Sequence, residues 1–146
     1  MKYLVIFGPN LNLTGFLSQG DKQRLTLEKM YTALRKTSSI SSVDLKIYQL
    51  QSEAAATNLI ARQRNKVDAI VLIPGIWAKT GHLLLETLEM IGLPVAVGNF
   101  ALGDGKWDYS GESILTQVAI MEQRCETEQD LQQLLTRFYD YLSQPR

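Results

Sequence analysis

The chain has 146 residues with fifteen basic and fifteen acidic side chains, so its formal net charge is zero. This length suits one domain spanning residues 1–146, and the balanced charge argues against nucleic acid as a partner. The single cysteine excludes an intrachain disulfide, and the single histidine argues against a histidine-based metal site. No apolar stretch is long enough to span a bilayer, so we expect a cytoplasmic protein with no membrane partner.

Apolar runs of strand length alternate with stretches of helical length. In chain order, the pattern predicts a strand (2–7), a helix (25–36), a strand (43–50), a helix (53–65), a strand (67–73), a helix (80–90) and a strand (94–100). Residues 103–111 are expected to form a loop. This alternation predicts an α/β fold with a flavodoxin-like, doubly wound parallel sheet of five strands.

Residues 114–121 fit either a fifth strand or the start of a helix. We predict a strand there, because Thr127 and Asp130 have the spacing of a new helix start ahead of an apolar pattern. The final helix is therefore expected to begin near Thr127.

The most informative stretch is GPNLNLTG at residues 8–15, directly after the first strand. Open parallel sheets bind ligands at the carboxyl edge of their strands, and this turn places two amide side chains there. Asn10 and Asn12 either contact a ligand or cap the turn locally. We favour a ligand role for Asn12 and a turn role for Asn10, which stays a candidate substrate contact.

This motif closely resembles the opening of the type II 3-dehydroquinate dehydratases. Three further landmarks are in register with that family, namely Leu27-Glu28, Gln49 with Glu53, and Pro74-Gly75. The resemblance covers roughly residues 2–113. It implies a flavodoxin-like domain that eliminates water from 3-dehydroquinate through an enolate, without a cofactor. It also implies a small-molecule ligand and a homo-oligomer, either a trimer or a dodecamer of trimers.

The resemblance assigns roles to individual positions, and several positions depart from the family pattern. Asn12 matches the asparagine that orients a water to stabilise the enolate. Lys22 stands where the family has its tyrosine base, and Lys79 stands where it has a histidine. Asn99 replaces the histidine that acts as general acid.

The groups that hold the substrate also differ. Leu17 stands where the family has an arginine, and Ile73 stands where it has a substrate-binding asparagine. The carboxylate-binding arginine falls near Ser110, whereas Lys106 matches another arginine. Glu86 keeps an acidic residue whose family counterpart acts across a subunit boundary, so an interface ion pair is its alternative role.

Two tryptophans are candidates for the walls of a ligand pocket. Trp77 stands where the family has a tyrosine and fits core packing equally well, whereas Trp107 lies in a glycine-rich loop. Asp104 and Asp108 flank Trp107 as candidate acids or bases, with a solvated loop carboxylate as the alternative. Cys125 is expected to be a small buried apolar group.

Proton abstraction beside a ketone requires a base, and loss of hydroxide requires an acid, yet Asn99 cannot transfer a proton. We therefore expect a dehydroquinase scaffold repurposed for a small, less polar, cyclic or aromatic substrate, with lyase, isomerase or cyclase chemistry. Lys79, Asn99 and Asn12 would line the site. Two alternatives remain open: a catalytically inactive oligomeric binding or assembly protein, and a divergent true 3-dehydroquinate dehydratase. A pocket filled by Trp77 and Ile73 would favour the inactive protein.

Overall fold

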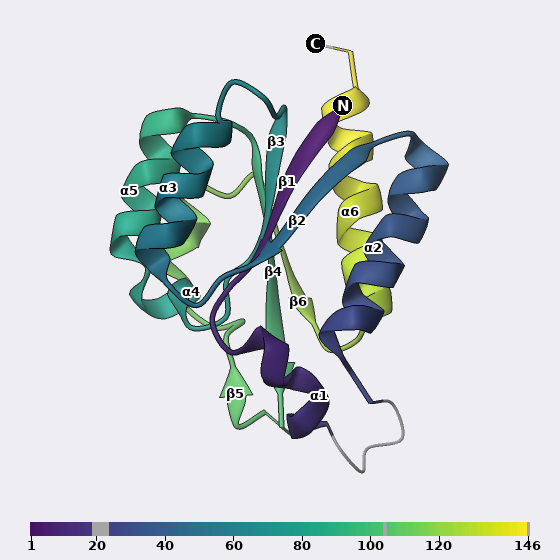
Figure 1. Ribbon diagram of the computed structural model, residues 1–146, viewed down its shortest axis with the longest axis vertical. Coiled ribbons are helices and arrows are strands. Elements are labelled where there is room, and N and C mark those ends of the chain that lie inside the picture. Colours follow the sequence, from purple (N-terminus) through teal and green to yellow (C-terminus); the bar gives the residue numbers. More distant parts are fainter. Residues whose placement is uncertain (19–23, 104, 146) are drawn as a thin grey trace.

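The computed structural model describes residues 1–18, 24–103 and 105–145, and it has a central sheet between two layers of helices (Figure 1). Five strands run parallel in the order β2-β1-β3-β4-β6. Their bounds are Asp44–Gln49 (β2), Lys2–Phe7 (β1), Ala69–Ile73 (β3), Val95–Leu102 (β4) and Met121–Cys125 (β6). The predicted α/β fold with a doubly wound, flavodoxin-like parallel sheet is confirmed.

The helices divide between the two faces of the sheet. The helices α2 (Leu27–Ser41) and α6 (Glu128–Ser143) cover one face, and α3 (Glu53–Gln63) and α5 (His82–Ile91) cover the other (Figure 1). Side chains alternate along β1, so that Phe7 packs toward α2 and α6 whereas Ile6 packs toward α3 and α5. Central strands buried on both faces give the continuous apolar runs seen in the sequence.

The helix α2 begins two residues after its predicted start and ends five residues after its predicted end. Thr26 caps it by accepting a hydrogen bond from the amide of Lys29 at 3.1 Å. The hydroxyls of Ser38 and Ser39 donate to the Arg35 carbonyl within the helix, which satisfies side chains that otherwise favour turns. The helix ends at Ser42, whose backbone is left-handed with φ 56°.

The prediction of a strand over 114–121 is wrong. Residues Ile114–Gln117 form a 3-10 helix (η2), and the strand β6 begins only at Met121. Ser113 caps η2 by accepting a hydrogen bond from the Leu115 amide, and the Leu115 side chain is fully buried beside α5. The apolar residues before β6 therefore cover the sheet instead of extending it.

The loop expected over 103–111 contains a short sixth strand. Trp107–Asp108 (β5) pairs antiparallel with Leu102 and Ala101 at the end of β4. The helix predicted over 80–90 also differs, because Trp77–Thr80 (α4) forms a separate turn and Gly81 divides it from α5. At the end of the chain, the start of α6 is confirmed, since Asp130 accepts a hydrogen bond from the Thr127 amide at 3.0 Å.

Among the described residues, the structure contains no helix with both the length and the hydropathy needed to cross a lipid bilayer.

Two buried groups predict how stability depends on pH. Tyr3 and Cys125 are fully buried, and burial raises the pKa of each to about 12, from 10.0 for the phenol and 9.0 for the thiol. As the pH rises, the unfolded chain releases these protons before the folded chain does. The free energy of unfolding is therefore expected to keep the whole contribution of these two groups below about pH 9 and to fall between about pH 9 and 12. Urea unfolding at about pH 8 and 10.5 measures the decline.

The variant Tyr3→Phe with Cys125→Ala is expected to lose less stability over the same pH range, because neither replacement ionises. An equal decline in the variant and the parent protein would show that other groups cause it.

Candidate active site

The carboxyl ends of β1, β2 and β3 meet at the first loop. The Gly8 amide donates to the Ile73 carbonyl at 2.7 Å, and the Gly8 carbonyl accepts from the Gln49 side chain at 3.1 Å. Asn10 has a left-handed backbone with φ 66°, and its amide donates to Gln51 Oε1 at 2.7 Å. Gln51 Nε2 in turn donates to Asn10 Oδ1 at 3.0 Å. These bonds hold the loop in place and support the turn role for Asn10.

An apolar pocket of about 170 Å³ opens beside this loop, and we call it the aromatic pocket. The first loop forms one wall and the segment after β4 forms the other. Its lining residues are Pro9, Asn10, Leu11, Leu13, Leu17, Leu102, Trp107 and Tyr109. The pocket therefore lies at the sheet edge where the loop motif predicts a ligand.

Trp107 is held in this wall by its own loop. A Cβ added at Gly103 would lie 2.7 Å from Trp107 Cε3, so the ring requires a glycine at that position. Lys106 Nζ lies 4.9 Å from the centre of the ring, a cation–π contact. The Trp107 side chain still keeps 37% exposure, which leaves a face of the ring available to a ligand.

Among the residues that the structure describes, Tyr109 is the one ionisable side chain that lines the aromatic pocket. Burial raises the pKa of its phenol above the ordinary 10.0. The group is therefore protonated at neutral pH and serves as a hydrogen-bond donor or acceptor rather than as a base.

A small polar cluster lies beside the pocket, centred on Asp108. The amide and hydroxyl of Ser110 both donate to Asp108, and they hold the pKa of this carboxyl below its ordinary value. Arg124 Nη2 lies 3.7 Å from Asp108 Oδ2, and the charges of Arg124 and Lys79 lower the same pKa further. Lys79 Nζ would lie 3.9 Å from a Cβ added at Gly111, so Lys79 lies beside the loop after β5, although it does not line the aromatic pocket.

Asn99 is buried in the sheet. Only 2% of the residue is exposed, and its Nδ2 donates to Glu122 Oε2 on β6 at 3.0 Å. Its Oδ1 is buried with no hydrogen-bond partner among the described residues. Asn99 does not line the aromatic pocket, and its contact with Glu122 was not anticipated from the sequence.

The remaining predicted residues are dispersed. Ile73 is fully buried in the cluster under α2 and α6, and Trp77 is 4% exposed in the cluster under α3 and α5, so neither fills the aromatic pocket. Asn12 is exposed on the 3-10 helix η1 (Leu11–Leu13), and Glu86 is exposed on α5. Lys22 and Asp104 lie outside the described residues.

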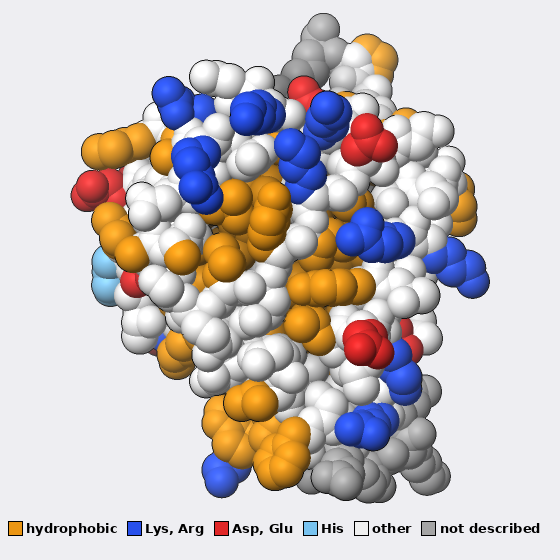
Figure 2. All heavy atoms as spheres, in the orientation of Figure 1, with side chains coloured by type: hydrophobic (Ala, Val, Ile, Leu, Met, Phe, Trp, Pro, Cys, Tyr) orange, Lys and Arg blue, Asp and Glu red, His pale blue; other side chains and the backbone are white. Residues whose placement is uncertain are grey.

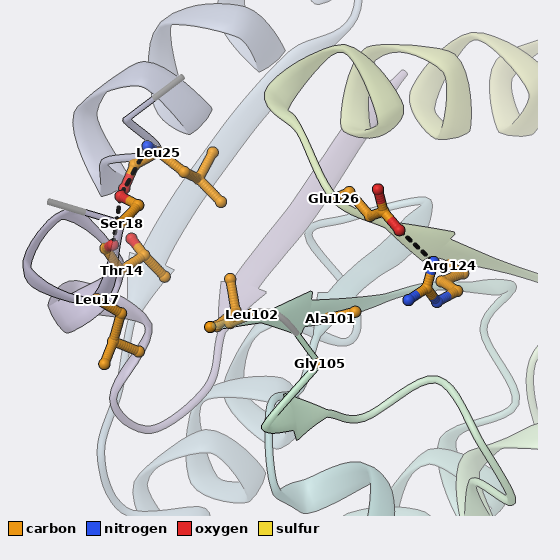
Figure 3. A pocket seen from close by; sticks show the side chains of 10 residues that line it. Thr14, Leu17, Ser18, Leu25, Ala101, Leu102, Gly105, Arg124 and Glu126 are labelled. Atoms are coloured by element: carbon orange, nitrogen blue, oxygen red, sulfur yellow. Dashed lines mark hydrogen bonds and ion pairs between the residues drawn. The ribbon is translucent and has the colours of Figure 1, made fainter. Parts of the chain in front are cut away.

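A second, larger hollow of about 330 Å³ adjoins the aromatic pocket, and we call it the charged cleft (Figure 3). One side is formed by the short helix α1 (Thr14–Leu17) and by Ser18 and Leu25. Leu102 from β4 and the charged residues Arg124 and Glu126 form the opposite side. The Ser18 hydroxyl donates to the Thr14 carbonyl at 2.8 Å and accepts from the Leu25 amide at 2.9 Å, which fixes the first side.

Hydrophobic side chains gather on the surface around these openings, at the lower end of the molecule in Figure 2, where Figure 1 places α1 and β5. Leu13, Phe16 and Trp107 are exposed by 46%, 73% and 37%. Exposed apolar groups around a pocket are typical of a binding surface.

Sequence reasoning missed Tyr109, Leu102 and Arg124. Tyr109 belongs to the same loop as Trp107, so the aromatic pair in this loop was a usable signal. Leu102 and Arg124 are brought to the site by the pairing of β4 with β5 and β6, which no local pattern reveals.

No group of three or more His, Cys, Asp or Glu side chains able to hold a metal ion occurs among the residues that the structure describes. The side chains described above include amides, hydroxyls, carboxylates, lysines, an arginine and aromatic rings, and lysines and carboxylates are groups that can transfer protons.

Comparison with known proteins identifies the fold and the family. The family model for dehydroquinase class II matches residues 1–122. A 3-dehydroquinate dehydratase from Prochlorococcus marinus is 32% identical over 120 residues, covering 82% of this chain and 80% of the relative. One from Pelotomaculum thermopropionicum is 28% identical over 119 residues, covering 82% and 83%.

A solved structure supports the same assignment at the level of the fold. The type II dehydroquinase from Butyrivibrio crossotus superposes with a TM-score of 0.82 at 18% identity, covering 94% of this chain and 97% of that one. The loop motif, the parallel sheet and the match over residues 1–122 agree, and the chain belongs to the dehydroquinase class II family.

Proposed function

We propose that this chain is a lyase that binds a small cyclic substrate in the aromatic pocket and eliminates a leaving group from it through an enolate. The observation that carries the proposal is the open pocket at the carboxyl edge of the sheet, next to the first loop. The bulky replacements Ile73 and Trp77 are packed into the core, so they leave this pocket free. An open pocket argues against the inactive assembly protein.

Family membership supports 3-dehydroquinate as the first substrate to test. Both relatives described above carry the name 3-dehydroquinate dehydratase. The two alignments cover 80% and 83% of the relatives and 82% of this chain. In that reaction a base removes a proton from the carbon beside the ketone, and the electron pair of the broken C–H bond forms the enolate. The enolate collapses back to the ketone and expels hydroxide from the β-carbon, and an acid gives the hydroxide a proton to release water.

We assign the proton transfer to Lys79 and the stabilisation of the enolate, through a bound water, to Asn12. Lys79 Nζ lies 3.9 Å from a Cβ placed on Gly111, and its charge acts on Asp108. Its amine can exchange a proton where an amide such as Asn99 cannot. Lys22 is the second candidate base. The step requires only a base and an acid, so the proposal includes no cofactor.

A less hydroxylated substrate is the second candidate, and the lining of the pocket favours it. Leu11, Leu13, Leu17 and Leu102 present no hydrogen-bonding side chains, and Trp107 offers an aromatic face. A substrate hydroxyl placed against these leucines would lose its bonds to water without replacement, at a cost of about 1–3 kcal/mol each. A flatter ring with fewer hydroxyls avoids this cost.

The test is an assay of 3-dehydroquinate dehydration, followed by the absorbance of the conjugated product, beside an authentic class II dehydroquinase at the same concentration. A cyclohexanone carboxylate with a single β-hydroxyl serves as the less hydroxylated substrate. Turnover of the first compound supports the true dehydratase, and turnover of the second alone supports the altered specificity. If neither compound is turned over, the lyase proposal is wrong.

We further propose that the chain works as a cytoplasmic homo-oligomer, a trimer or a dodecamer. Family membership supports this, and α5 carries the exposed apolar side chains Leu83 and Met90 beside Glu86. Sedimentation equilibrium measures the mass directly, and a monomer at micromolar concentration would contradict the assembly.

A further inference from the structure

The aromatic pocket and the charged cleft are neighbours, because Leu17 and Leu102 line both. The aromatic pocket alone holds about 170 Å³, which is small for a ligand site, whereas the cleft adds about 330 Å³. Typical small-molecule sites begin near roughly 300 Å³. A ligand of ordinary size would therefore occupy the pocket and extend across the two leucines into the cleft.

The two parts differ in chemistry. The pocket offers apolar walls and the ring of Trp107, whereas the cleft ends at the guanidinium of Arg124 (Figure 3). A ligand that matches both parts has an apolar ring at one end and an anionic group at the other.

Arg124 is available to such an anion. Its side chain is 50% exposed, and its ion-pair partners Asp108 and Glu126 are 38% and 59% exposed. Exposed ion pairs contribute little net stability, so a ligand carboxylate can replace Glu126 on the guanidinium. Asp108 keeps its two hydrogen bonds from Ser110, and Lys79 contributes positive charge from its other side.

We propose that Arg124 anchors the carboxylate of a small cyclic acid whose ring lies in the aromatic pocket against Trp107. This assignment rests on the proposed function for the identity of the pocket, and it adds the residue that selects an anionic substrate. The ring lies against Leu17 and Leu102, which line both hollows, and the carboxylate replaces Glu126 on the Arg124 guanidinium.

The test compares benzoate with benzamide, a flat ring with and without the negative charge, by calorimetric or NMR titration. Benzoate is expected to bind at least about tenfold more tightly, because a charge-assisted bond to Arg124 is available only to the carboxylate. Arg124→Gln is expected to remove this preference and to leave benzamide binding unchanged. The melting temperature of the variant confirms that it is folded.

Arg137→Gln is the matched control, since Arg137 is an exposed arginine on α6 whose guanidinium donates to the Gln123 side chain at 2.9 Å. It should keep the full preference for benzoate. Equal binding of the two probes to the parent protein, an undiminished preference in Arg124→Gln, or no binding of benzoate at about 10 mM would overturn the proposal. Neither probe is turned over, so the result stands apart from the lyase assay.

Discussion

Gly8→Ala is expected to destabilise the protein by about 3 kcal/mol, because the new methyl group has no space. A Cβ at Gly8 would lie 2.2 Å from the Pro74 carbonyl oxygen and 3.1 Å from Trp77 Cε3. The first contact is with backbone, so no side-chain rotation relieves it. The first loop would have to move away from the turn after β3, and the hydrogen bond from the Gly8 amide to the Ile73 carbonyl would lengthen.

Thermal and urea unfolding measure this effect, and a loss of about 10 °C in melting temperature is expected for a chain of this length. Gly111→Ala is the control, since Gly111 is exposed, lacks a left-handed backbone, and its nearest atom to an added Cβ is Lys79 Nζ at 3.9 Å. This control should change stability by less than about 0.5 kcal/mol. Similar losses in both variants would show that backbone entropy, rather than the clash, sets the cost.

The same contact explains why the first loop carries information about function. Gly8 lets the loop lie directly on the turn at Pro74, and Gln51 then holds Asn10 from the loop after β2. The packing that stabilises the sheet edge therefore also shapes one wall of the aromatic pocket.

The parallel sheet could be predicted from the sequence because its central strands are buried on both faces. The runs at β1 and β3 are continuously apolar for this reason, and the strands predicted over 2–7 and 67–73 start and end within two residues of the observed ones. The capping box at Thr127 is a local signal, and it identified the start of α6 correctly.

Elements that depend on distant partners could not be read from local patterns. The strand β5 is only Trp107–Asp108, and it exists because β4 extends beyond the other strands to pair with it. Residues 114–121 are apolar because they cover α5 and the sheet, and such burial looks like a strand in the sequence.

The candidate site was predicted in position but only partly in composition. The aromatic pocket lies at the edge of the sheet that the motif indicates, and Trp107 lines the pocket there. Asn99 lies at the same end of β4, yet the alternation of the strand directs it toward Glu122. Arg124 reaches the cleft only through the pairing of β6 with β4, so its role depends on the assembled sheet.

Lys79→Met is expected to lower kcat by at least about 100-fold on the substrate that the lyase assay identifies, with little change in stability. General acid–base catalysis contributes typically about 10²–10⁴-fold, and methionine keeps the length of the side chain without an exchangeable proton. Lys79 is partly exposed, and its charge acts on Asp108 beside the aromatic pocket. Steady-state kinetics on the folded variant measure the loss.

Two further variants separate proton transfer from charge. Lys79→Arg keeps the positive charge but holds its proton at any accessible pH, so it should lose kcat as Lys79→Met does if the amine moves a proton. If Lys79 only binds an anion, Lys79→Arg should retain kcat, and the assignment of proton transfer is then wrong. Lys66→Met is the control, because Lys66 is exposed in the turn before β3, at the opposite end of the strands, and should leave kcat unchanged.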